Sequence, residues 1–195
     1  MSNVKDALPL IRGGDLTTIP NLLSFARIGG VAVSVALYLA GHRGLALAIG
    51  TVAGLTDFLD GYMARRLQQE TALGAMLDQA ADSFTTAILL AMLVVVGGIP
   101  FAFLAIFLLR EFWVGTIRRY GAAEGFEIPS SNLGKLATAL IYLAILAVAV
   151  AILPELPAQL ATALHWLGLV GLGAGLVVSC ATAWHYTRAL AVSPA

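Results

Sequence analysis

The chain has 195 residues, of which 59% are hydrophobic and only 11% are charged, and its mean hydropathy is +0.90. Soluble globular domains carry about 25% charged residues, so this composition excludes an ordinary soluble domain and indicates an integral membrane protein. Eleven basic residues balance 11 acidic ones, so the net charge gives no reason to expect a nucleic acid partner.

Charge-poor stretches bounded by Gly, Pro or polar residues divide the chain into six predicted helical spans. At about 20 residues per crossing, the length of the chain accommodates roughly this number of helices. In chain order, the spans cover about 18–40, 45–67, 72–96, 101–120, 133–153 and 159–190. The predicted fold class is therefore all-α, an integral membrane bundle of six transmembrane helices.

Turns and loops separate the later spans. Gly97–Pro100 predicts a tight turn, residues 121–132 are predicted to form a loop, and Pro154–Pro157 predicts a second turn. The sixth span is long enough to contain a break, and four of its glycines predict close helix packing: Gly168, Gly171, Gly173 and Gly175. The predicted domains are a cytoplasmic N-terminal segment (1–17), a catalytic transmembrane domain (18–190) and a C-terminal tail (191–195).

Lys and Arg are distributed unequally between the two sides of such a bundle. With six crossings, only Arg43 lies in a loop on the side opposite the N-terminus. The N-terminal side carries Lys5, Arg12, Arg65, Arg66, Arg118, Arg119, Lys135 and Arg188. Short loops rich in Lys and Arg stay in the cytoplasm, so both termini are predicted to be cytoplasmic, and the expected location is a prokaryotic plasma (inner) membrane.

Carboxylates are concentrated in the second and third spans. They are Asp57, Asp60, Asp78 and Asp82. Spacings of three and four residues place each pair on one helical face, and a short connection brings both pairs to the cytoplasmic end. A structural network with Arg65 and Arg110 would set four acids against two bases, so one or two divalent metal ions are the better explanation. Ligation by oxygen alone predicts Mg²⁺ or Mn²⁺.

The neighbouring residues suit a phosphate-containing substrate. Gly61, Ala64 and Gly74 leave room for a ligand to approach the backbone, and Arg65 offers a planar fork to a phosphate. Two divalent ions bridging carboxylates and phosphate oxygens are the usual apparatus for displacement at phosphorus. A second set of cations, expected at the cytoplasmic ends of spans four and five, suits a second phosphate: Arg110, Arg118 and Lys135.

These residues together resemble the signature of the CDP-alcohol phosphotransferase family. The signature positions are Asp57, Asp60, Gly61, Ala64, Arg65, Gly74, Asp78 and Asp82. The resemblance implies a six-helix homodimer with a two-metal site, which transfers a substituted phosphate from a CDP-linked donor to an alcohol and releases CMP. It implies that Asp57, Asp60 and Asp78 bind metal. It also implies that Asp82 completes the metal site and accepts the proton of the attacking hydroxyl, and that Gly61, Ala64, Arg65 and Gly74 line the CDP pocket.

Segments outside the signature are similar to those of the phosphatidylglycerophosphate synthases. They are Ile19–Ser24 leading to Arg27, Arg110–Glu111 followed by Arg118, and Gly134–Lys135. This similarity implies CDP-diacylglycerol as the donor and glycerol 3-phosphate as the acceptor. Those enzymes tend to carry a second Lys where this chain has Ala137. Phosphatidylglycerol, the acceptor of a cardiolipin synthase, and an inositol phosphate therefore stay open as alternative acceptors.

Two other classes of membrane protein fit this sequence less well. A membrane prenyltransferase needs a second acidic motif on a later helix, but after Glu127 the only acid is Glu155, in a loop on the far side. A cation or proton carrier has no use for the small residues of the signature and distributes its acids across the membrane.

Arg27, several residues inside the first span, either extends to the cytoplasmic surface or faces the bundle.

Overall fold

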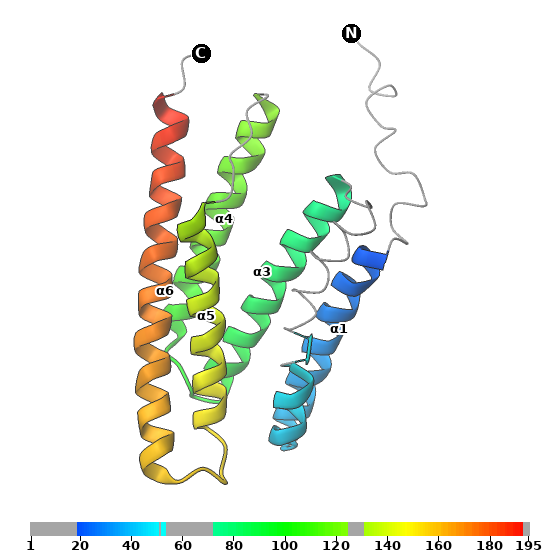
Figure 1. The fold of residues 1–195 in the computed structure, drawn as a ribbon, viewed down its shortest axis with the longest axis vertical. Coiled ribbons are helices and arrows are strands. Elements are labelled where there is room, and N and C mark those ends of the chain that lie inside the picture. Colours follow the sequence, from blue (N-terminus) through cyan, green and yellow to red (C-terminus); the bar gives the residue numbers. More distant parts are fainter. Residues whose placement is uncertain (1–18, 51, 54–71, 125–130, 193–195) are drawn as a thin grey trace. The chain divides into compact units, whose positions relative to one another are not determined.

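The structure is a computed structural model that describes residues 19–50, 52–53, 72–124 and 131–192. Within these residues all regular secondary structure is helical, which confirms the all-α prediction (Figure 1). The helices are α1 (Ile19–Leu39), α3 (Ala72–Val95), α4 (Phe101–Ala123), α5 (Asn132–Ala151) and α6 (Ala158–Val192). A shorter helical stretch covers residues 43–50 and 52–53, at the start of the predicted second span.

Four of the described helices contain segments that are long and apolar enough to cross a membrane. These segments are Leu22–Leu39, Met76–Val95, Asn132–Ala151 and Ala158–Arg188. The expected count of six crossings stays a prediction, because most of the second span lies outside the described residues and because charged side chains interrupt α4. The chain is nevertheless a helical membrane protein, since apolar helices of this length match the thickness of a bilayer.

The observed helix bounds differ from the predicted ones in two places. The predicted loop at 121–132 is wrong at its start, because α4 continues to Ala123 and the Glu124 N–H donates to the carbonyls of Tyr120 and Gly121. Ala122 and Ala123 favour helix, so α4 extends past the predicted end of the fourth span. The sixth span is a single 35-residue helix that includes residues 191–192 of the predicted tail.

Two helix ends close in the same way, with a glycine in the left-handed region. Gly41 has φ +92°, and its N–H donates to Tyr38 O at 3.1 Å while the His42 N–H donates to Leu37 O at 2.9 Å. The end of α3 repeats this arrangement at Gly97, which has φ +72°. Only glycine adopts such a conformation without a steric cost, so both α1 and α3 end at a Schellman motif. The predicted turn at Gly97–Pro100 is confirmed.

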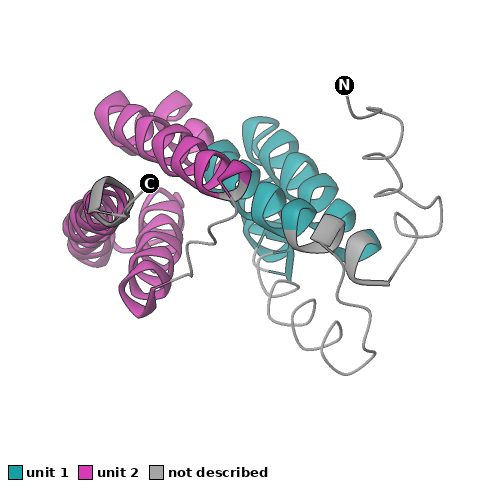
Figure 2. Ribbon diagram, turned by 90° about the horizontal axis from the view of Figure 1, so that it is seen from above, with its two compact units in different colours: residues 1–88 teal, residues 89–195 magenta. Residues whose placement is uncertain are grey.

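The chain divides into two compact units, residues 1–88 and 89–195 (Figure 2). In the first unit, α1 packs closely on the helical stretch that follows it. The Ser34 hydroxyl donates to the Ala46 carbonyl at 2.7 Å, and a Cβ added at Gly50 would lie 2.8 Å from Ser34 Oγ. The buried hydroxyl is thus satisfied by a backbone carbonyl, as a polar group in an apolar interior must be.

In the second unit, α6 packs against α5 and α4. Gly168 and Gly175 are seven residues apart on α6 and face α5. A Cβ added at Gly168 would lie 2.5 Å from a Val148 methyl group, and one added at Gly175 would lie 2.8 Å from Ile141. The predicted close packing is confirmed at these two glycines. It is absent at Gly173, where an added Cβ would meet only Phe103, at 4.0 Å.

The contact of Gly168 and Gly175 with α5, called the seam below, predicts opposite effects for two Gly→Ala substitutions on α6. Gly168→Ala places a methyl group against the α5 backbone and should lower the free energy of unfolding by about 1–3 kcal/mol. Gly173→Ala is the matched control. It has space and gains helix propensity, so it should be neutral or stabilising by up to about 1 kcal/mol. Thermal unfolding of both variants in the same detergent tests the seam, and equal midpoints for the two would contradict it.

Candidate active site

The structure describes part of the predicted signature. Gly74 lies in the first turn of α3, and Asp78 and Asp82 follow on the same helix. The other signature residues fall outside the described residues: Asp57, Asp60, Gly61, Ala64 and Arg65. In the described part of the chain no group of three or more His, Cys, Asp or Glu side chains is placed to hold a metal ion. The expected meeting of four acids therefore stays a prediction.

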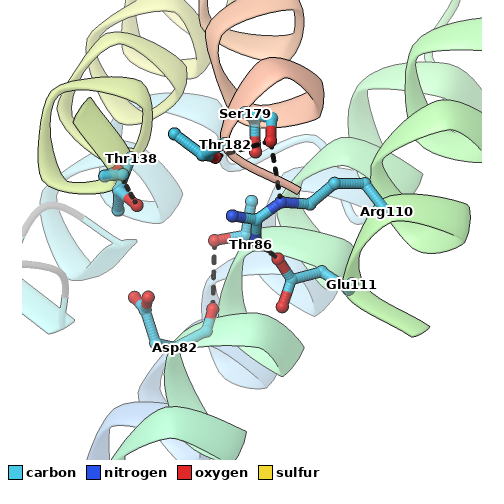
Figure 3. Close-up of polar contacts among 8 residues, drawn as sticks. Asp82, Thr86, Arg110, Glu111, Thr138, Ser179 and Thr182 are labelled. Carbon is cyan, nitrogen blue, oxygen red and sulfur yellow. Dashed lines mark hydrogen bonds and ion pairs between the residues drawn. The ribbon is translucent and has the colours of Figure 1, made fainter. Parts of the chain in front are cut away.

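Asp78 and Asp82 lie four residues apart on α3, so they share one helical face. The Asp82 side chain is half-buried, and its backbone carbonyl accepts a hydrogen bond from Thr86 Oγ1 at 3.0 Å (Figure 3). Thr86 is buried, and this bond satisfies its hydroxyl within the helix.

For Arg27, the structure decides between the two predicted placements, at the cytoplasmic surface or facing the bundle. Its side chain is 1% exposed, so it faces the interior and does not extend to the surface. Its Nη2 donates to Asp78 Oδ1 at 3.3 Å, and the Asp78 side chain is 52% exposed. A guanidinium buried to this degree requires an anionic partner, because an uncompensated charge in an apolar interior is strongly destabilising. Asp78 provides one.

The described acids are compatible with a divalent metal ion. Asp78 and Asp82 present only carboxylate oxygens, which Mg²⁺ and Mn²⁺ prefer. Arg27 contacts Asp78 through Oδ1, and among the described residues no second side chain bonds this carboxylate, so Oδ2 is available as a ligand. The donor chemistry of α3 thus fits the predicted metal site.

A second polar cluster joins α4, α5 and α6. Ser131 caps the N-terminus of α5 and accepts a hydrogen bond from the Gly134 N–H at 3.0 Å. The Tyr186 hydroxyl accepts from the Ser131 N–H at 3.0 Å and donates to Ser131 Oγ at 3.2 Å. Arg118 places its guanidinium carbon 5.9 Å from the centroid of the Tyr186 ring. Tyr186 therefore connects Arg118 to the first turn of α5, where Lys135 lies exposed.

The Nε of Arg118 is buried and has no hydrogen-bond partner among the described residues. Buried donors are nearly always bonded to protein, water or a ligand. An anion next to Arg118 would satisfy this donor.

Arg110 is placed differently from the expectation. It lies in the middle of α4, eight residues or about 12 Å before Arg118, so it does not share the helix end with the other two cations. Its Nε donates to the Ser179 carbonyl of α6 at 3.4 Å, and it forms an ion pair with Glu111 (Figure 3). Thr182 Oγ1 donates to the same carbonyl at 2.7 Å. These contacts tie α4 to α6.

Sequence reasoning missed Tyr186 and Glu111 as members of these clusters. Tyr186 lies in a predicted span, six residues before the end of α6, where a tyrosine is ordinarily an interfacial anchor. Glu111 directly follows Arg110, but neighbouring residues on a helix do not face each other, so spacing gave no reason to pair them. For Glu111, the available signal was an acidic residue directly after a basic one in the middle of an otherwise apolar span.

The chain was compared with protein families and with known proteins. A family model described as CDP-alcohol phosphatidyltransferase matches residues 17–174. A CDP-diacylglycerol–glycerol-3-phosphate 3-phosphatidyltransferase of Rickettsia typhi is 32% identical over 126 residues, which cover 63% of this chain and 71% of that protein. A cardiolipin synthase (CMP-forming) of Streptomyces coelicolor is 37% identical over 132 residues, covering 62% and 60% respectively.

A solved structure is also similar in fold. The apo crystal structure of a phosphatidylinositol phosphate synthase of Mycobacterium tuberculosis superimposes with a TM-score of 0.56 and 18% identity, covering 91% of this chain and 92% of that one. At this level of identity the similarity establishes the fold.

The cluster around Tyr186 leads to a stability prediction. Tyr186→Phe removes both hydrogen bonds to Ser131 and keeps the ring, so the free energy of unfolding should fall by about 1–2 kcal/mol. Hydrogen exchange should also become faster at the amides of residues 131–135. Tyr120→Phe on α4 is the control, because Tyr120 is 56% exposed. Unchanged exchange in Tyr186→Phe would contradict a connecting role.

Proposed function

We propose that this protein transfers the phosphatidyl group of CDP-diacylglycerol to the hydroxyl of glycerol 3-phosphate and releases CMP. The proposal proceeds from the family: the chain belongs to the CDP-alcohol phosphatidyltransferase family, whose model covers residues 17–174. The observation that carries this choice of acceptor is that several relatives, 31–34% identical to this chain, are named for that reaction. The relative that is named a cardiolipin synthase supports phosphatidylglycerol as the second candidate acceptor.

The donor is assigned to the signature residues. Gly61, Ala64 and Gly74 leave space for the CDP moiety, and Arg65 binds its diphosphate. Two divalent ions, Mg²⁺ or Mn²⁺, are assigned to Asp57, Asp60, Asp78 and Asp82. When bound, such ions neutralise the charge of the phosphates and stabilise the entering and leaving oxygens. The exposed carboxylate of Asp78 and the position of Asp82 on the same face of α3 support this assignment.

Asp82 accepts the proton of the acceptor's hydroxyl. The freed oxygen forms a bond to the phosphorus that carries the diacylglycerol, the bond from that phosphorus to the oxygen of CMP breaks, and CMP leaves. Asp82 suits this role because its side chain is half-buried and lies one helical turn from Asp78 on the same face of α3. A base at this position turns a weak nucleophile into a competent one.

The acceptor's phosphate is assigned to Arg118 and Lys135, with Arg110 as a further candidate. The support from the structure is the buried Nε of Arg118, which has no partner among the described residues, beside the first turn of α5. A phosphate dianion loses its hydration on entering an apolar site, and charge-assisted hydrogen bonds offset this loss. Arg110 is the weaker candidate because Glu111 and the Ser179 carbonyl already engage it.

The cellular setting and the assembly are part of the same proposal. We place both termini on the cytoplasmic side of a prokaryotic plasma membrane, because the basic residues accumulate in the loops on that side. The water-soluble acceptor and the product CMP are then on the side where metabolism uses them. A homodimer is proposed from family membership alone.

The metal assignment predicts the effect of removing one carboxylate. Asp57→Asn and Asp78→Asn nearly conserve shape and remove a charged ligand, so CMP release should fall at least about 100-fold, or about 2.7 kcal/mol. Chelation should stop the parent enzyme, and Mg²⁺ or Mn²⁺ should restore it. Glu155→Gln, which removes an exposed acid from the loop between α5 and α6, serves as the control and should keep full activity. A chelator-resistant parent would contradict the metal assignment.

The acceptor assignment predicts a selective effect on one Michaelis constant. Arg118→Ala or Lys135→Ala should raise the KM for glycerol 3-phosphate about ten- to a hundred-fold, equivalent to about 1.5–3 kcal/mol for one charged hydrogen bond. The KM for CDP-diacylglycerol should hardly change. Arg119→Ala is the matched control, since Arg119 is exposed on the same helix and its contact is with Thr116.

The same assay decides between the acceptors. Purified protein with CDP-diacylglycerol is given glycerol 3-phosphate, phosphatidylglycerol or inositol phosphate, and CMP is measured. Release with phosphatidylglycerol alone would identify a cardiolipin synthase. No release with any acceptor would overturn the proposed reaction.

A further inference from the structure

Arg27 stands out among the charged residues that the structure describes because it is fully buried. Its side chain is 1% exposed and is the largest of the fully buried side chains. It lies eight residues into α1, outside the signature, and the reaction proposed above gives it no role. A buried arginine at membrane depth has a high energetic cost, which marks it as functional by default.

The geometry of its contact restricts that function. Arg27 Nη2 reaches a single oxygen of Asp78, Oδ1, at 3.3 Å. The carboxylate itself is 52% exposed, so packing does not fix its orientation. Arg27, which burial holds in place, can therefore set the direction of this carboxylate. Metal ligands are commonly oriented in this way by a hydrogen bond from a residue that does not touch the metal.

We propose that Arg27 is a positioning residue that holds Asp78 by Oδ1 and so presents Oδ2 to a divalent cation. This inference rests on the proposed metal site of the transferase. A guanidinium suits the task because its planar nitrogens fix a direction, whereas an ammonium group is a point charge on a flexible chain. Simple charge compensation would require only a cation at this place. The two roles therefore respond differently to Arg27→Lys.

The experiment measures Mn²⁺ binding to the purified full chain in detergent, by electron paramagnetic resonance of free Mn²⁺ and without substrates. Removal of an orienting partner typically costs about ten- to a hundred-fold in metal affinity. Arg27→Lys keeps the charge and loses the planar group, and should weaken Mn²⁺ binding at least about tenfold. Arg27→Gln should weaken it as well, although removing a nearby positive charge would by itself tighten cation binding.

Two controls separate positioning from a merely structural role. Ser34→Ala removes another buried polar contact of α1, to the Ala46 carbonyl, and should leave Mn²⁺ affinity unchanged even if it lowers stability. In an Asp78→Asn background, Arg27→Lys should have no further effect, because the carboxylate that it orients is gone. Thermal unfolding of each variant without metal reports any loss of folding directly.

Each result decides the proposal. Parent-like affinity in Arg27→Lys, or tighter binding in Arg27→Gln, would overturn it in favour of charge compensation. A parent that binds no Mn²⁺ would overturn it together with the metal site. A parent that binds Mn²⁺ in an Arg27-dependent way but releases no CMP would leave this inference standing and would refute only the proposed reaction.

Discussion

The cost of a charge inside an apolar bundle is the constraint on which the polar architecture of this protein depends. Arg27 is buried with Asp78 as its partner. The half-buried Arg110 contacts Glu111 and a backbone carbonyl, and the half-buried Arg118 lies against the Tyr186 ring. An unpaired ion in such surroundings is strongly destabilising. Each of these cations consequently contacts a second helix, so the charged groups also connect the helices.

Close helix packing makes those connections possible in the second unit. Gly168 and Gly175 let α6 approach the backbone of α5, and the same helix carries Ser179 and Tyr186 toward their partners. Close packing of small residues substitutes here for the hydrophobic effect, which gives little drive for association within lipid. The surroundings of Arg118 are thus set by α6, a helix that contributes no residue to the family signature.

The placement of charges within helices was predicted with uneven success. Asp78 and Asp82 share a face of α3 as expected, because a spacing of four residues fixes relative direction within one helix. Arg110 does not share the helix end with Arg118, and Ala122 and Ala123 continue α4 into the expected loop. The extension of α4 arises at a helix end, where local sequence is a weak guide. The separation of Arg110 from Arg118 follows from their eight-residue spacing on one helix.

The sequence by itself determined the helical class, most of the helix bounds, the turn at Gly97 and the family signature, because hydropathy, glycine conformation and i, i+4 spacing are local properties. Only the tertiary structure decided that Arg27 turns inward to Asp78, that Tyr186 joins Arg118 to α5, and that Gly168 rather than Gly173 lies in the seam. These choices depend on how each helix is rotated about its own axis against its neighbour. In a helix that is apolar all round, no stripe of polar residues in the sequence reveals that rotation.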